Sequence, residues 1–131
     1  MVSHIQRLRT CVRDGIYSED GLKFDNKWEL AYYRYCKANN FKIERQPLIL
    51  EFIYNKKVKK YKPDFRVNGQ LIEIKGDHFF ENRDKNLKMI CPYDRSKDNL
   101  YEAKHQCMLA NNVKILTFAD LEEMKVFDYF S

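Results

Sequence analysis

The sequence predicts an α/β protein of the α+β class, in which a mixed β-sheet is flanked by helices. Two runs of alternating apolar residues flank Asn68-Gly69, and this is the strongest short-range signal for an antiparallel hairpin. Apolar residues recur at helical spacing in segments 27–39 and 96–110. The apolar run 113–118 follows the second helix, so a helical crossover would place it parallel to the hairpin strands.

The bulk composition indicates one domain with one core over residues 1–131, in which residues 1–20 form a possible N-terminal arm. The formal net charge of +5 favours a polyanionic partner. No apolar run approaches the ~18 residues of a membrane span, and the N-terminus lacks the apolar region of a signal peptide. We therefore expect a cytoplasmic protein with no membrane contact.

The N-terminal segment 1–20 carries Arg7, Arg9 and Arg13 among apolar residues, which predicts a short basic amphipathic helix. Such a helix would either bind nucleic acid or pack its apolar face on the sheet edge, and the sequence leaves both accounts open. A turn is expected at Ser18–Gly21.

Segment 27–39 is expected to form a helix with Asp25 or Asn26 as its N-cap and a stop at Asn39-Asn40. Its aromatic stripe is typical of core packing. Glu29 lies in the first turn, where a carboxylate suits the helix dipole. The alternative is that Glu29 points towards the hairpin, and spacing alone favours the dipole account.

Two further strands are expected on either side of Pro47, at 42–46 and 49–54, and Gln46 is a candidate site residue at a strand end. A basic run follows and leads into the hairpin, where its cations would neutralise phosphate. Its lysines are Lys56, Lys57, Lys59, Lys60 and Lys62. The alternative account is a solvated polar turn.

The hairpin around Asn68-Gly69 has a register that its two-residue turn dictates. Asp64 faces Glu73, and by the period of two Lys75 lies on the same side of the sheet. The apolar residues occupy the opposite side, namely Phe65, Val67, Ile72 and Ile74. Because two adjacent carboxylates repel each other unless a cation lies between them, the hairpin predicts a site for a hard metal ion.

Segment 77–93 has no clean period, and we expect a mobile, partly basic loop beside the site. His78 is the one imidazole near the hairpin and a candidate catalytic group, although a satisfied or solvent-exposed histidine is the simpler account. Arg83 and Lys85 are candidate nucleic-acid contacts.

The C-terminal part is expected to contain a helix at 96–110 with Ser96 as its N-cap, and a short helix at 119–127 capped by Thr117 or Asp120. Three potential metal ligands also occur here, Cys91, His105 and Cys107. A structural zinc site takes four ligands, so ordinary reduced thiols are the favoured account.

The carboxylates of the hairpin suit magnesium, which usually takes one or two carboxylates together with phosphate and water. Asp64 and Glu73 supply the carboxylates, the backbone carbonyl of Ile74 supplies a third oxygen, and Mn²⁺ is the expected substitute. Lys75 cannot ligate a cation, but it can orient an attacking water or hold a phosphate. A metal, a water and a lysine at a phosphodiester make a hydrolase, to which Glu29 would add a ligand if it reached the site.

The motif Pro63-Asp64 followed by Glu73-Ile74-Lys75 resembles that of the PD-(D/E)XK nuclease superfamily. Within that superfamily the chain is most similar to phage-type endonuclease I, a Holliday-junction resolvase, and to related small phage and transposon endonucleases. The likeness comprises a YxPDF segment at 61–65, an E-x-K-G ending at 73–76 and a glutamate on the preceding helix, and it covers about residues 24–88.

This resemblance implies a restriction-endonuclease-like mixed sheet and assigns roles to four residues. Asp64 and Glu73 would be metal ligands, Lys75 the catalytic lysine, and Glu29 the fourth member of the active site and a further metal ligand. It also implies a DNA substrate, a homodimer and a bacterial or phage-infected cell as the setting.

We therefore expect a Mg²⁺-dependent DNA endonuclease that selects branched DNA such as a Holliday junction, with RNA as a substrate left open. The second hypothesis is a nucleic-acid-binding protein on a nuclease-like scaffold without catalysis. The third is a domain with no nucleic-acid partner, whose carboxylates form surface ion pairs with the basic run 56–62.

Overall fold

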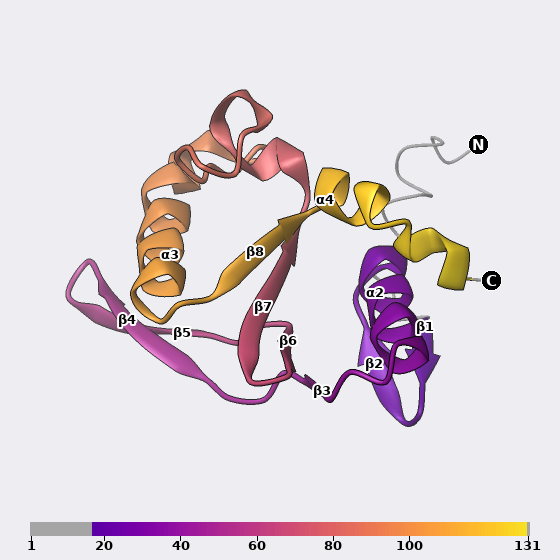
Figure 1. Cartoon of the computed structure of the whole chain (residues 1–131). Helices are drawn as coiled ribbons and strands as arrows, with labels where there is room; N and C mark the ends of the chain where they lie inside the picture. The colour runs from indigo at the N-terminus through magenta and orange to yellow at the C-terminus, as the bar shows by residue number, and fades with distance from the viewer. Residues whose placement is uncertain (1–16, 131) are drawn as a thin grey trace, which may run out of the picture.

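A four-stranded mixed sheet forms the centre of the structure, a computed structural model that describes residues 17–130 (Figure 1). Its strand order is β3-β6-β7-β8. The strands are β3 (Ile43–Arg45), β6 (Phe65–Val67), β7 (Gln70–Lys75) and β8 (Lys114–Thr117). The first three are antiparallel, whereas β8 runs parallel to β7, as the crossover through the preceding helix requires. The α+β class with a mixed sheet is confirmed.

The hairpin of β6 and β7 has the predicted register, because its turn leaves only two residues between the strands. Asn68 and Gly69 both have positive φ, at 49° and 87°, as a two-residue I′ turn requires. The ladder pairs Phe65 with Ile72 and stops there, so Asp64 lies just before the first paired residue of β6.

Helix α2 (Lys27–Ala38) begins and ends where the sequence predicts. The side chain of Asn26 accepts a hydrogen bond of 3.0 Å from the backbone N–H of Glu29, and Asn39 forms the C-cap. Helix α4 is shorter than predicted. It covers Phe118–Glu123, with Thr117 and Asp120 joined in a capping box, and a separate 3₁₀ turn covers Val126–Tyr129.

Helix α3 (Asp98–Ala110) differs from the prediction at its start. A 3₁₀ turn over Arg95–Lys97 precedes it, and Asp94 caps that turn by accepting from the backbone N–H of Ser96. The prediction that Ser96 is the N-cap is therefore wrong, because Ser96 lies inside the 3₁₀ turn and the N-cap of α3 is Lys97, which makes no side-chain capping bond.

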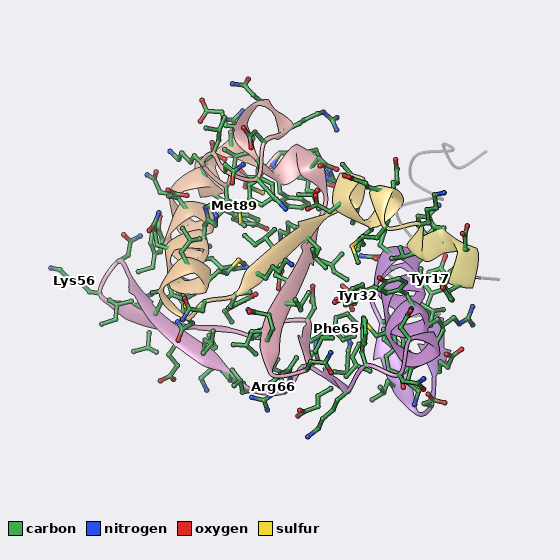
Figure 2. The ribbon with its side chains drawn as sticks, viewed as in Figure 1. Tyr17, Tyr32, Lys56, Phe65, Arg66 and Met89 are labelled. Carbon is green, nitrogen blue, oxygen red and sulfur yellow. The ribbon has the colours of Figure 1, made fainter. Side chains whose placement is uncertain are left out.

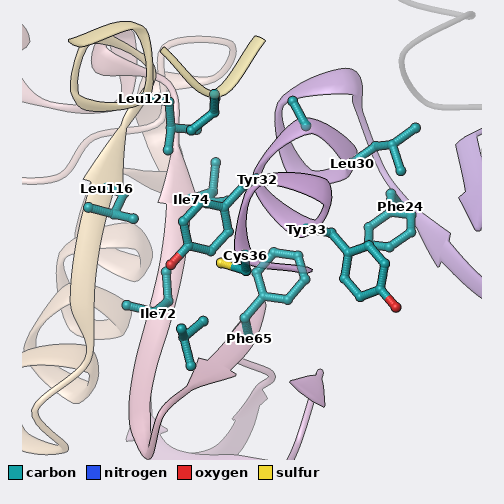
Figure 3. Close-up of a cluster of buried hydrophobic side chains, with 13 residues drawn as sticks. Phe24, Leu30, Tyr32, Tyr33, Cys36, Phe65, Ile72, Ile74, Leu116 and Leu121 are labelled. Atoms are coloured by element: carbon teal, nitrogen blue, oxygen red, sulfur yellow. The ribbon is translucent and has the colours of Figure 1, made fainter. Parts of the chain in front are cut away.

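The two faces of the sheet are covered by different elements, α2 and α4 on one side and α3 on the other (Figure 1). Side chains alternate along β7 and β8, so neighbouring residues enter different clusters. Ile72, Ile74 and Leu116 pack with Tyr32 and Cys36 of α2 on the first face (Figure 3). The second face packs against α3 and the loop after β7, through Ile115, Met108, Phe80 and Met89.

Two small hairpins complete the fold and revise two predictions. Strands β1 (Tyr17–Glu19) and β2 (Leu22–Phe24) pair around the predicted turn, so residues 17–19 are strand rather than helix; the rest of the predicted N-terminal helix lies outside the described residues. Strands β4 (Leu50–Tyr54) and β5 (Lys57–Tyr61) pair around a turn at Asn55-Lys56.

The loop between β7 and α3 packs against the second face of the sheet. Two 3₁₀ turns, Asp77–Phe79 and Glu81–Arg83, are followed by a β-bridge between Phe80 and Met89. Both residues of the bridge are fully buried, so their apolar side chains hold the loop on the second face of the sheet. Within residues 17–130, no helix has the length and apolar composition to cross a bilayer.

The N-cap of α2 gives a testable prediction for stability. Asn26→Ala is expected to lower the free energy of unfolding by about 1 kcal/mol, because the N–H of Glu29 loses its acceptor. Urea unfolding followed by circular dichroism measures the loss. Asn26→Ser, which keeps a capping oxygen, should restore most of it, and an equally large loss in this variant would contradict the capping account.

Candidate active site

A cavity of about 220 Å³ at the C-terminal end of β7 brings together the four residues predicted to act in catalysis. Glu29, Asp64, Glu73 and Lys75 all line it, although they come from α2, the start of β6 and β7. The other lining residues are Asp25, Asn26, Ile74, Gly76, Phe79 and Phe118. The predicted convergence of the carboxylates and the lysine is therefore found, whereas their roles remain predictions.

Each of the two hairpin carboxylates accepts a hydrogen bond from a neighbouring element. Asp64 Oδ2 accepts a bond of 2.7 Å from the backbone N–H of Ile74. Glu73 points away from the first hydrophobic cluster, as strand alternation dictates, and its Oε1 accepts a bond of 2.5 Å from the hydroxyl of Tyr61. Tyr61 thus orients a site carboxylate from the end of β5, a contact that sequence spacing alone did not reveal.

Glu29 reaches the cavity from the first turn of α2. Its Oε1 accepts hydrogen bonds from the backbone N–H of Asp25, at 3.2 Å, and from Arg45, at 2.7 Å. Glu29 therefore lies at the N-terminus of α2 and also lines the cavity. The two interpretations of Glu29, a favourable charge at the helix N-terminus and a side chain that points towards the hairpin, are compatible.

Arg45 is the main site residue that sequence reasoning missed. Its guanidinium lies 2.7 Å from Glu29 Oε1 and 3.7 Å from Asp64 Oδ1, and it donates to the backbone carbonyl of Asp64 at 3.1 Å. The rings of Phe24 and Phe65 flank it at 5.3 and 5.1 Å, and its side chain is only 5% exposed. An arginine in a short strand carries no local signal of such a role, because its partners come from other elements.

The ammonium group of Lys75 is held by aromatic rings rather than by a carboxylate. Its Nζ lies 4.4 Å from the ring centre of Phe79 and 5.6 Å from that of Tyr101. Across residues 17–130 it makes no ion pair within 4.0 Å. Its three N–H donors are therefore not committed to an acidic partner. Lys104, also absent from the sequence-based prediction, lies over the same Tyr101 ring at 5.0 Å.

Burial dominates the electrostatics of the three carboxylates. It raises the pKa of Glu29 to about 8, with the charge of Asp64 adding to the rise and Arg45 opposing it. Burial, followed by the charge of Glu73, also raises the pKa of Asp64. The pKa of Glu73 rises through burial, although Lys75 opposes the shift. Arg45 opposes the rise in pKa at Glu29 and Asp64, and Lys75 and Lys104 oppose it at Glu73. A divalent ion in the cavity would favour the ionised carboxylates further.

The donor set of the cavity fits a hard cation that is completed by non-protein ligands. Glu29 Oε2 and Glu73 Oε2 accept no hydrogen bond from the described residues. Every fully buried side-chain oxygen of those residues has a hydrogen-bond partner, so these two oxygens are not fully buried. Those two oxygens are therefore open to the cavity. Within residues 17–130, no group of three His, Cys, Asp or Glu side chains is arranged to hold a metal alone. Magnesium suits such a site, because it usually keeps waters and takes substrate phosphate as ligands.

The predicted neighbours of the site lie outside the carboxylate cavity. Gln46 is exposed and contributes only its backbone N–H, which donates to the carbonyl of Asp64 at 2.9 Å. His78 lines an adjacent cavity, where its Nε2 shares a hydrogen bond of 2.8 Å with the hydroxyl of Tyr93. Burial, with the charge of Arg83, lowers the pKa of His78.

The predicted nucleic-acid contacts are dispersed. Lys85 is paired with Asp120 at 2.7 Å, so its charge is already compensated, whereas Arg83 is exposed. The basic run was expected beside the carboxylates, but most of it forms β5, and Lys56 lies at the far tip of the hairpin (Figure 2). Strand β5 extends from Lys57 to Tyr61 and rises about 3.3 Å per residue, so its lysines lie progressively farther from Tyr61. Lys62, two residues before Asp64, is the lysine of the run that lies nearest to Asp64 in the chain.

Two minor hypotheses find no support. No lysine of the 56–62 run forms an ion pair with another described residue, and the site carboxylates pair with Arg45 instead, so the surface ion-pair hypothesis is wrong. Cys91 and Cys107 are buried free thiols, and His105 lies 3.3 Å from Glu102. The favoured account of ordinary thiols agrees with this arrangement.

Comparison of the chain with protein-family models, with curated proteins and with solved structures finds no match. What the cavity can do is therefore inferred from its own residues.

The buried guanidinium gives the first prediction for the site. Arg45→Met is expected to lower the free energy of unfolding by about 3–5 kcal/mol at pH 8, because Glu29 and Asp64 lose their shared cation. The loss should shrink at pH 5, where the carboxylates can take up protons. The control is Arg66→Met, which breaks the surface pair with Glu44 and should cost about 0–1 kcal/mol. Equal losses in the two variants would contradict a special role for Arg45.

Glu29 gives a pH-dependent prediction. Its folded pKa of about 8 exceeds the ordinary value of 4.5, so its contribution to stability is full below about pH 4.5 and is lost as the pH rises through about 8. In EDTA, the unfolding free energy of the wild type relative to Glu29→Gln is therefore expected to fall across this window. Glu123→Gln, at an exposed position, should show a constant difference. A constant difference for Glu29→Gln as well would refute the shift.

Proposed function

We propose that this chain is a Mg²⁺-dependent endonuclease of the PD-(D/E)XK type that hydrolyses phosphodiester bonds of DNA. The observation that carries the proposal is that Glu29, Asp64, Glu73 and Lys75 line one cavity. Three carboxylates in a protein of net charge +5 would repel a nucleic acid unless a cation lay between them. A metal-dependent reaction on a polyanion accounts for both the clustered carboxylates and the positive net charge.

The roles of the residues follow from their contacts. Asp64, Glu73 and the carbonyl of Ile74 would hold the ion, which would neutralise charge on the phosphate and lower the pKa of a bound water. Lys75 makes no ion pair with an acidic side chain of residues 17–130, so it can bind a phosphate oxygen while negative charge develops there. Tyr61 and the N–H of Ile74 each occupy one carboxylate oxygen and thereby orient the other towards the cavity.

Glu29 and Arg45 have supporting roles in this proposal. The Arg45 guanidinium joins the carboxylates of α2 and β6, so it fixes the distance between two elements that are far apart in the sequence. In hydrolysis the oxygen of one water bonds to phosphorus, one phosphorus–oxygen ester bond breaks, and the leaving oxygen takes up a proton. Glu29 lies close enough to the other carboxylates to bear a proton during this exchange, given its raised pKa.

Incubation with supercoiled plasmid tests the proposal. In Mg²⁺ or Mn²⁺ the wild type is expected to nick the plasmid, and EDTA, Asp64→Asn or Lys75→Met should abolish the nicking. The matched control is Asp128→Asn, an exposed aspartate whose side chain has no hydrogen-bond partner among the described residues, which should keep full activity. Mg²⁺ should also raise the melting temperature of the wild type but not that of Asp64→Asn.

Other outcomes discriminate between the hypotheses. An intact plasmid together with salt-sensitive DNA binding would identify a nucleic-acid-binding protein without catalysis. If nicking occurs, a panel of linear duplex, flap, four-way junction and single strand tests the preference for branched DNA. Dominant cutting of plain duplex would reject that preference and leave the nuclease proposal intact.

A further inference from the structure

A second and larger cavity, of about 510 Å³, lies beside the carboxylate cavity. Four residues line both spaces, namely Asp25, Asn26, Phe79 and Phe118. The remaining residues line the larger space alone and are Lys27, Trp28, His78 and Tyr93. None of the three site carboxylates lines it. The two cavities therefore share a wall but differ in chemistry, and we call the larger one the aromatic pocket.

The walls of the aromatic pocket consist mainly of rings. Trp28 and Phe118 are stacked, with ring centres 4.3 Å apart and planes 5° from parallel. Tyr93 meets His78 and Phe79 edge-on, at interplanar angles of 68° and 79°. A volume of this size is typical of sites that take small, mostly apolar ligands with a few oriented polar groups.

Tyr93 is exposed and yet held in place. The residue is 71% exposed, the second-highest exposure among the large hydrophobic residues of the described chain. Its hydroxyl shares a hydrogen bond with His78, and the imidazole lies so close to Gly76 that a Cβ at Gly76 would overlap it. The ring is thus anchored to the end of β7, and its exposure makes it accessible for stacking on a ligand.

The charges that line the pocket suit a neutral ligand. Asp25 and Lys27 offset each other, and the lowered pKa of His78 keeps its imidazole neutral at pH 7. The oxygen of the Asn26 side chain is occupied by the helix N-terminus, which leaves its amide group as a hydrogen-bond donor. Aromatic faces, a few edge polar groups and no net charge match a nucleobase better than a phosphate.

We propose that the aromatic pocket receives one unpaired nucleobase of the DNA strand whose phosphate lies in the carboxylate cavity, with Tyr93 stacked on that base. The inference rests on the proposed function, because the shared wall places the base next to the reacting phosphate. A base within a duplex would first have to leave the stack, at a cost of a few kcal/mol. An unpaired base at a bulge, flap or branch avoids that cost.

Binding to a matched pair of DNA molecules tests the inference. One is a duplex with a single-nucleotide bulge, and the other carries an abasic bulge with the same phosphates. With Ca²⁺ in place of Mg²⁺, the wild type is expected to bind the base-bearing duplex more tightly. Tyr93→Ala should weaken that binding by roughly 5- to 150-fold, the range for loss of one base–aromatic stack, and leave abasic binding unchanged.

Two control variants separate stacking from other effects. Tyr93→Phe keeps the ring and should keep most of the preference, although it loses the hydrogen bond to His78. Tyr54→Ala removes a partly exposed tyrosine on the β4–β5 hairpin and should not alter the preference. Trp28 is the single tryptophan and lines the pocket, so the base-bearing duplex should quench its fluorescence while the abasic duplex should not.

The outcomes distinguish this inference from the proposed function. Equal affinity for both duplexes, or equal losses in Tyr93→Ala and Tyr54→Ala, would overturn the base pocket. Mg²⁺-dependent cleavage that ignores the unpaired base would overturn it too and leave the nuclease proposal standing. A Tyr93-dependent preference for the base, in a protein that never cleaves, would support the pocket and reject the nuclease proposal.

Discussion

Three carboxylates buried at one end of β7 impose the strongest constraint on this structure. Taking charges out of water costs several kcal/mol each unless partners compensate them. Arg45 lies between Glu29 and Asp64, while Tyr61 and the backbone N–H of Ile74 each bond one carboxylate. These partners come from β3, β5 and β7, so hydrogen bonds and ion pairs at the end of β7 connect three strands.

The same strand also serves the hydrophobic core, because its side chains alternate. Ile72 and Ile74 enter the cluster beneath α2, whereas Glu73 lies on the other side, towards α3. The packing of α2 on β7 in this cluster therefore determines where Glu29 lies. Glu29 is in the first turn of α2, and that packing places the turn beside the cavity. Both the core packing and the geometry of the site thus depend on the register of β7, and a shift of that register would disrupt both.

On the proposals made above, adjacent walls of the protein would contact different parts of one nucleotide. The carboxylate cavity, with Lys75 over its aromatic neighbours, offers a place for a phosphate and its cation. The aromatic pocket, closed on one side by Tyr93, offers a place for a base. Phe79 belongs to both spaces and also lies beside the Lys75 ammonium, so it would couple the position of the base to that of Lys75.

Features that depend on neighbours along the chain could be predicted from the amino-acid sequence. The turn at Asn68-Gly69 set the register of the hairpin, and Asn26 set the start of α2, because both depend on contacts within a few residues. The resemblance to the PD-(D/E)XK motif pointed to Glu29, Asp64 and Glu73, which line one cavity. The packing of the whole fold brought Arg45 to Glu29 and Asp64, directed the lysines of β5 away from the site, and placed Tyr93 in the wall of the aromatic pocket. These outcomes depend on pairs far apart in the chain, whose encounter is set by the packing of whole elements rather than by local spacing.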